Sequence, residues 1–193
     1  MTADIDLPGF ADPARGAQRS FRALLAAMSR PGSLHQLGAE LSPPAGLDGA
    51  TAAVLLTLAD SETTLWLDPG LAAARNWIAF HCGTAFAKTP EQAGFVVATR
   101  LPDLGALDTG TDEAPEQAST AIVQVAALGE GPAYRLAGPG LAAPAMLRVR
   151  GLPDDFIVRW QANQALYPRG VDLMLCAGTV LAALPRSVRI EAG

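Results

Sequence analysis

The chain has 193 residues, and because domains usually contain about 100 to 200 residues, we expect a single domain over 1–193. Half of the residues are hydrophobic and 17% are charged, which excludes a disordered tail and is enough for a full core. The net charge of −5, with no cluster of lysine or arginine, excludes a surface that binds nucleic acid.

The first half of the chain predicts helices that alternate with short strands. Asp12 is a favourable N-cap, Pro13 suits the first helical position, and the apolar residues that follow recur at helical spacing. Pro31-Gly32 ends this helix. The next helix is apolar on nearly all sides, so we expect it to be buried. The elements predicted here are helices at 13–30, 50–58 and 71–80 and strands at 33–37 and 63–67.

Runs of β-branched and apolar residues predict more strands in the second half. We expect the strand at 120–125 to be central, and the last two strands to form a hairpin around Ala177-Gly178. Helices interleave with strands, but strands follow one another near the C-terminus. We therefore predict an α/β fold of three layers, α/β/α, around a mixed sheet. The elements predicted here are strands at 95–98, 120–125, 134–136, 147–149, 171–176 and 179–184 and a helix at 154–166.

The sequence also predicts the compartment. No apolar run approaches the ~20 residues that span a bilayer, so no membrane association is expected. The first residues lack the basic and apolar regions of a secretory signal, so we expect a cytoplasmic protein. Cys82 and Cys176 are expected to be reduced thiols, because a chain with a full core does not need a disulfide.

Cofactor and metal motifs are weak. The segment 138–143 fits the relaxed GxGxxG/A pattern of dinucleotide-binding turns, but prolines bracket it and no helix is predicted after it, so an ordinary turn is favoured. The sole lysine, Lys88, lies in a predicted loop, whereas pyridoxal phosphate is carried on a buried lysine. His81-Cys82 are neighbours, and neither CxxC nor HExxH spacing occurs. We expect no bound cofactor and no metal, with a nucleotide-binding module at 138–143 as an alternative.

Side chains at the ends of elements are the remaining candidates. His81 either interacts with the end of its predicted helix or serves as an acid–base group. Arg169 and Arg186 are expected at one rim of the sheet, where they either grip an anion or form salt bridges, for instance with Asp172 or Glu191. The catalytic candidates are thus His81, Arg186 and Asp172, and the anion-binding candidates are Arg169 and Arg186. A stand-alone small-molecule enzyme using His81 and Arg186 is one functional hypothesis.

Six stretches in one order along the chain carry a more specific pattern. They are 12–32, 54–60 with Trp66-Leu67, Phe80-His81, 107–111 with Pro115-Glu116, 167–172 and 183–186. Together they resemble the family of H subunits of the bacterial carbon-phosphorus lyase system, over nearly the whole chain. There are two departures. The proline that often follows Phe-His-Thr in that family is missing after Phe80-His81, and the family's Pro-Arg-Thr-Thr is Pro185-Arg186-Ser187-Val188 here.

The resemblance implies a subunit of an assembly that degrades organophosphonates. In that system the G, H, I and L subunits are needed to transfer the ribose triphosphate of ATP to an alkylphosphonate, with release of adenine. The family fold is similar to the large domain of pyridoxal-phosphate-dependent transferases, without the cofactor. Family members form homodimers in isolation and join the G, I and J subunits in the core complex. MgATP is a substrate of the complex, and the H subunit is not expected to be active alone. The resemblance supplies no catalytic residues.

Overall fold

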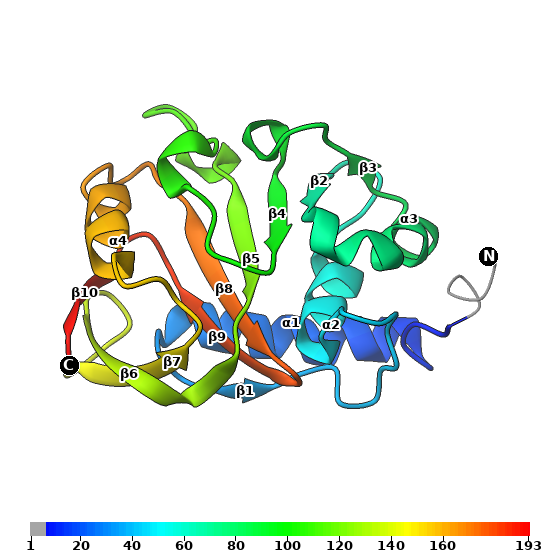
Figure 1. Ribbon diagram of the computed structural model, residues 1–193, viewed down its shortest axis with the longest axis horizontal. Helices are drawn as coiled ribbons and strands as arrows, with labels where there is room; N and C mark the ends of the chain where they lie inside the picture. Colours follow the sequence, from blue (N-terminus) through cyan, green and yellow to red (C-terminus); the bar gives the residue numbers. More distant parts are fainter. Residues whose placement is uncertain (1–6) are drawn as a thin grey trace.

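The computed structural model describes residues 7–193, which build a seven-stranded sheet flanked by helices and a separate three-stranded sheet (Figure 1). The α-helices are α1 (Pro13–Ser29), α2 (Gly49–Leu58), α3 (Arg75–Cys82) and α4 (Phe156–Gln164). The strands are β1 (His35–Gln36), β2 (Thr64–Leu67), β3 (Ala85–Phe86), β4 (Phe95–Ala98), β5 (Thr120–Gln124), β6 (Ala127–Ala137), β7 (Ala145–Arg150), β8 (Asp172–Ala177), β9 (Val180–Leu184) and β10 (Arg189–Ala192). Short 3₁₀ helices are η1 (Pro69–Ala74), η2 (Pro90–Gln92), η3 (Leu104–Ala106) and η4 (Pro115–Gln117).

The larger sheet is mixed, as predicted. Its order is β1-β9-β8-β5-β4-β2-β3, so β5 is the central strand. Strands β3, β2, β4, β5 and β8 run parallel, whereas β9 is antiparallel to β8 and β1 is antiparallel to β9. The predicted hairpin at the end of this sheet is confirmed as β8 and β9. An α/β fold around a mixed sheet is therefore correct.

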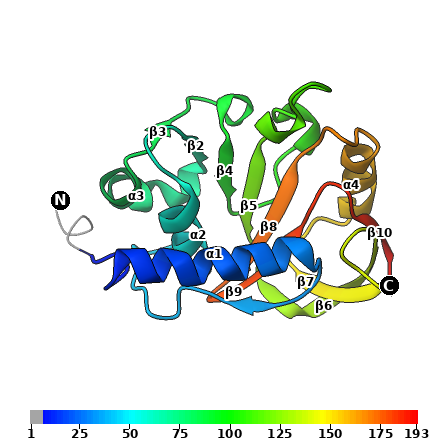
Figure 2. The same cartoon turned by 180° about the vertical axis from the view of Figure 1, so that it is seen from behind.

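The two faces of the sheet are covered differently. Helices α1, α2 and α3 cover one face, and Figure 2 shows α1 lying across it. Leu24, Val54 and Trp77 are buried there in one core cluster. The opposite face carries α4 together with the three-stranded sheet β10-β6-β7, and Phe156 and Trp160 of α4 are buried in a second core cluster. One outer layer is thus only partly helical, which corrects the expectation of a simple α/β/α sandwich. The similarity to the large domain of pyridoxal-phosphate-dependent transferases stays a prediction.

The small sheet is the main feature that sequence analysis missed. The strands predicted at 134–136 and 147–149 are parts of the long antiparallel hairpin β6–β7, which leaves the main sheet and pairs with β10. In β7 buried and less buried residues alternate, because one face packs on the second core and the other faces outward. The two-residue strands β1 and β3 lie at the edges of the main sheet, and β3 was not predicted.

The predicted helix at 71–80 is divided in the structure. Pro69 begins the 3₁₀ helix η1, and Asp68 caps it by accepting a hydrogen bond of 2.9 Å from the Gly70 N–H. The α-helical part, α3, begins only at Arg75 and ends at Cys82, and Gly83 caps it in a left-handed conformation with φ of 67°. Within residues 7–193, no helix is both long enough and apolar enough to cross a membrane.

Candidate functional site

Three segments that are distant in sequence meet at the amino end of β8. Arg169 and Gly170 precede the strand, Asp172 begins it, and Arg186 follows its partner strand β9. The loop that contains η4 joins them, because the Gly170 N–H donates to the Thr109 carbonyl at 2.9 Å. The predicted placement of both arginines at one rim of the sheet is therefore seen in the structure. We call this group, with the loop 107–117, the amino-end cluster.

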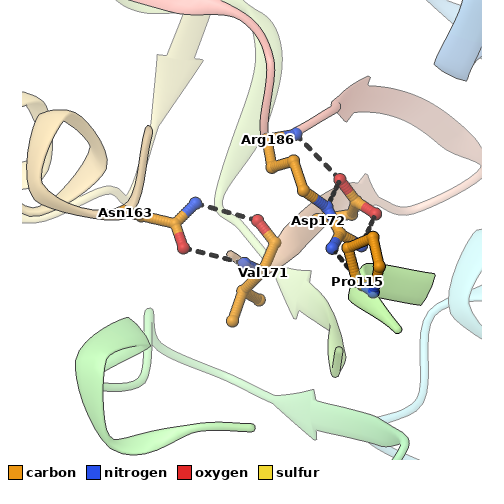
Figure 3. Close-up of polar contacts among 5 residues, drawn as sticks. All are labelled: Pro115, Asn163, Val171, Asp172 and Arg186. Carbon is orange, nitrogen blue, oxygen red and sulfur yellow. Dashed lines mark hydrogen bonds and ion pairs between the residues drawn. The ribbon is translucent and has the colours of Figure 1, made fainter. Parts of the chain in front are cut away.

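The Asp172–Arg186 ion pair is the centre of the amino-end cluster (Figure 3). The Arg186 side chain donates to Asp172 from Nη2 at 2.6 Å and from Nε at 3.1 Å, and the Arg186 backbone N–H donates to the same carboxylate at 2.8 Å. Nη1 of Arg186 donates to the Pro115 carbonyl. The two side chains are only 14% and 16% exposed. The guanidinium thus binds a carboxylate and a carbonyl, and through these bonds Arg186 connects β8, β9 and η4.

Arg169 and Glu191 have other partners. Nε of Arg169 lies 3.1 Å from Asp112 Oδ1, so its ion pair reaches the same loop that Arg186 contacts. Glu191 pairs with Arg135 at 3.0 Å in the three-stranded sheet and takes no part in the amino-end cluster. Of the two carboxylates suggested for Arg186 from the sequence, the structure selects Asp172.

Asn163 is a member of this cluster that sequence analysis did not find. Its amide donates to the Val171 carbonyl at 2.9 Å and accepts from the Val171 N–H at 2.8 Å, so one side chain satisfies both backbone groups (Figure 3). The adjacent Gly170 has φ of 118°, and a Cβ there would lie 3.0 Å from the Asn163 carbonyl oxygen. The spacing of Phe156, Trp160 and Asn163 was the available sign, because it puts an amide on the buried stripe of α4.

His81 lies elsewhere, at the end of α3. Its Nε2 is 3.0 Å from the Leu7 carbonyl, which also accepts a 2.8 Å hydrogen bond from Trp77 Nε1. The strand after α3 is β3, and β2, β4 and β5 separate β3 from β8, a span of four strand spacings or roughly 19 Å. The structure therefore brings Arg186, Asp172 and Arg169 together and leaves His81 apart, beside the first residues that it describes.

The remaining motifs take structural positions. The segment 138–143 lies in the turn between β6 and β7, and β7 follows it in place of the helix that a dinucleotide site uses. Lys88 is exposed in the loop before η2. Cys82 and Cys176 are buried free thiols, and burial raises the pKa of each to about 12. Among residues 7–193, no three histidine, cysteine or acidic side chains gather to hold a metal ion.

Comparison with known proteins gives matches over almost the whole chain. The family described as "Bacterial phosphonate metabolism protein (PhnH)" matches residues 8–191. A protein of Rhizobium meliloti (strain 1021), named "Alpha-D-ribose 1-methylphosphonate 5-triphosphate synthase subunit PhnH", is 40% identical over 187 residues, which are 94% of each chain. A protein of Stutzerimonas stutzeri, named "Putative C-P lyase subunit protein HtxG", is 36% identical over 183 residues, which are 90% of this chain and 85% of that protein.

Proposed function

The chain belongs to the PhnH family of bacterial phosphonate metabolism proteins, and from this we propose that it is a subunit of a carbon-phosphorus lyase system that degrades organophosphonates. With the G, I and L subunits it is required to transfer the ribose triphosphate moiety of ATP to an alkylphosphonate, with release of adenine. The observation that carries this proposal is the 40% identity over 94% of each chain with a relative named as a subunit of the synthase for that product.

Within the complex, the chain has a structural or co-catalytic role and is not active alone. The side chains that could take part in catalysis are either bound by other groups of the protein or buried. Arg186 is bound by Asp172, and His81 contacts a backbone carbonyl. Both thiols are buried, with pKa values raised to about 12, and so are poor nucleophiles. In this proposal the subunit binds no cofactor of its own, and MgATP is a substrate of the whole complex.

The proposed partners are a second copy of the chain in isolation and the G, I and J subunits in the complex. The buried core of a subunit interface is usually apolar. Helix α1 offers an apolar pair at the surface, because Phe21 and Leu25 are one helical turn apart and are 47% and 54% exposed. The proposed location is the cytoplasm.

The test is reconstitution from separately purified subunits. Adenine release from MgATP and methylphosphonate is measured for the complete set, for the set without this chain, and for this chain alone. We expect release from the complete set only. Full release without this chain would overturn its requirement, and turnover by this chain alone would overturn the subunit role. Co-purification of a tagged chain with the other subunits from phosphate-starved cells tests the partnership separately.

A further inference from the structure

The carboxyl end of the main sheet has the geometry of a ligand crevice. β2 and β4 are parallel neighbours, but the chain leaves them toward opposite faces. After β2 it enters η1 and α3, whose Leu71 and Trp77 are buried in the first core cluster. After β4 it passes through Leu101 and Leu104, which are buried in the second core cluster. In open α/β sheets such a divergence leaves a crevice outside the carboxyl ends of the strands, where ligands bind.

A pocket of 430 Å³ lies beside this point on the α4 face. Arg100 and Leu101 line it directly after β4, and Arg159 lines it from α4. The third wall is the segment 151–153 between β7 and α4. Gly151 packs against the bend that follows β5, because a Cβ there would lie 2.8 Å from the Ala126 nitrogen. The pocket therefore borders the carboxyl ends of β4 and β5, and its volume falls in the usual range for small-molecule sites.

The charged side chains that line the pocket are both basic, Arg100 and Arg159. Arg159 uses Nε to bind Asp155 Oδ2 at 2.8 Å, and its hydrogen bonds within residues 7–193 involve no Nη atom. Arg100 forms no ion pair among the residues that the structure describes. A guanidinium presents its donors in a fork that fits two oxygens of a tetrahedral anion. Two such groups lining one pocket favour a ligand with two negative charges.

Asp68, the carboxylate whose pKa the positive charge of Arg100 affects, is already hydrogen-bonded to other donors. Asp68 accepts hydrogen bonds from the Gly70 N–H at 2.9 Å, from the Thr99 N–H at 3.0 Å and from Thr99 Oγ1 at 2.7 Å. Burial alone would raise the pKa of Asp68, but these hydrogen bonds and the positive charge of Arg100 outweigh it and lower that pKa. Asp68 thus links the residues that follow β2 to Thr99, which follows β4. The Arg100 guanidinium is left without a bound carboxylate.

We propose that the pocket lined by Arg100, Arg159 and 151–153 binds a phosphonyl or phosphoryl dianion, with both guanidinium groups on its oxygens. The anion site rests on the geometry of the carboxyl end alone. The assignment of its anion to an organophosphonate substrate rests on the proposed function. The site is separate from the amino-end cluster, which lies at the opposite end of the same strands.

The test uses the full chain and three variants, Arg100→Gln, Arg159→Gln and Arg135→Gln. Arg135→Gln is the control matched to Arg159→Gln, because Arg135, like Arg159, is a half-exposed arginine in an ion pair but lies in the three-stranded sheet. Calorimetric titration with methylphosphonate and with inorganic phosphate gives Kd for each protein. Hydrogen bonds to a charged group are each worth about 1.5–3 kcal/mol, so each pocket variant should weaken binding about 10-fold or more. The control should stay within about twofold of the wild type.

Amide resonances give the position of the bound anion. Saturating methylphosphonate should shift the resonances of Gly151, Leu152 and Arg100 more than those of Gly170 and Asp172. Equal weakening by all three variants, shifts confined to the amino-end cluster, or no saturable binding of either anion would overturn the site. Binding of phosphate without binding of methylphosphonate would keep the anion site and overturn its assignment to a phosphonate substrate. Since none of these measurements needs another subunit, their failure is distinguishable from failure of the proposed function.

Discussion

Replacement of Asp172 by asparagine tests whether the amino-end cluster is a structural clamp. The substitution keeps the side-chain size and removes the charge that faces the Arg186 guanidinium. In the wild type, that carboxylate receives three hydrogen bonds from Arg186, at 2.6, 2.8 and 3.1 Å. The guanidinium, 14% exposed, would be left with an amide oxygen and the Pro115 carbonyl.

The expected cost lies at the lower end of the range for buried ion pairs. Removing one partner of a buried pair costs about 3–5 kcal/mol, and both side chains here keep some contact with water, so we expect about 3 kcal/mol. For a domain of this size, about 1 kcal/mol corresponds to a shift in Tm of about 2–4 °C, so Tm should fall by about 6–12 °C. Thermal and urea unfolding, followed by circular dichroism, measure both quantities.

Two further variants make the result interpretable. Glu191→Gln makes the same chemical change in an exposed pair, whose side chains are 47% and 63% exposed, and should cost at most about 1 kcal/mol. Adding Arg186→Met to Asp172→Asn removes the buried charge that Asp172→Asn leaves unpaired and should restore part of the lost stability, because the main cost of breaking a buried ion pair is the uncompensated charge. Equal losses for Asp172→Asn and Glu191→Gln would refute the reasoning, and so would a further loss of about 3 kcal/mol in the double variant.

Three other predictions follow from the same structure. Asn163→Ala leaves the N–H and carbonyl of Val171 unpaired and should cost about 2–4 kcal/mol in urea unfolding; a loss below about 0.5 kcal/mol would contradict this. Although burial opposes it, hydrogen bonding lowers the pKa of Asp68, so its ionised form stabilises the folded state above the unfolded pKa of about 3.9. The cost of Asp68→Asn should therefore be present at pH 7 and shrink as the pH falls below that unfolded pKa and through the lower pKa of the folded state, and a cost that stays constant with pH would contradict this. Cys82 and Cys176, with pKa values of about 12, should resist a chromogenic disulfide reagent at pH 8 and react fully in urea. Rapid reaction of the native protein would show that the thiols are not buried.

Local sequence patterns were sufficient for all strands of the main sheet except the two-residue edge strand β3. The N-cap Asp12 and Pro13 marked the start of α1 correctly, and Asp12 does accept a hydrogen bond from the Arg15 N–H at 3.1 Å. The β-branched run at β5 identified the central strand, because a strand buried on both faces is apolar throughout. Each of these features depends on residues close in sequence, and for this reason it could be predicted from the sequence alone.

The parts that were missed depend on partners distant in sequence. β10 pairs with β6 across more than fifty residues, as Ile190↔Leu136 shows, and four residues of unremarkable composition give no sign of that pairing. The 3₁₀ start of the predicted helix at 71–80 is another case, because Asp68 is held by Thr99, 31 residues away. A periodic pattern reports which face of a segment is buried, and it does not report what covers that face.

The same limit explains why the partners of individual arginines were hard to predict. Arg186 and Arg100 both follow a strand of the main sheet, but only Arg186 was proposed from the sequence as an anion-binding residue. What separates them is a carboxylate supplied by another strand. Asp172 begins β8 directly beside the end of β9 and forms an ion pair with Arg186, whereas Asp68 accepts hydrogen bonds from two backbone N–H groups and the Thr99 hydroxyl and forms no ion pair with Arg100. The amino end of the sheet therefore has its positive charge neutralised inside the protein, and the carboxyl end keeps its positive charge for a ligand.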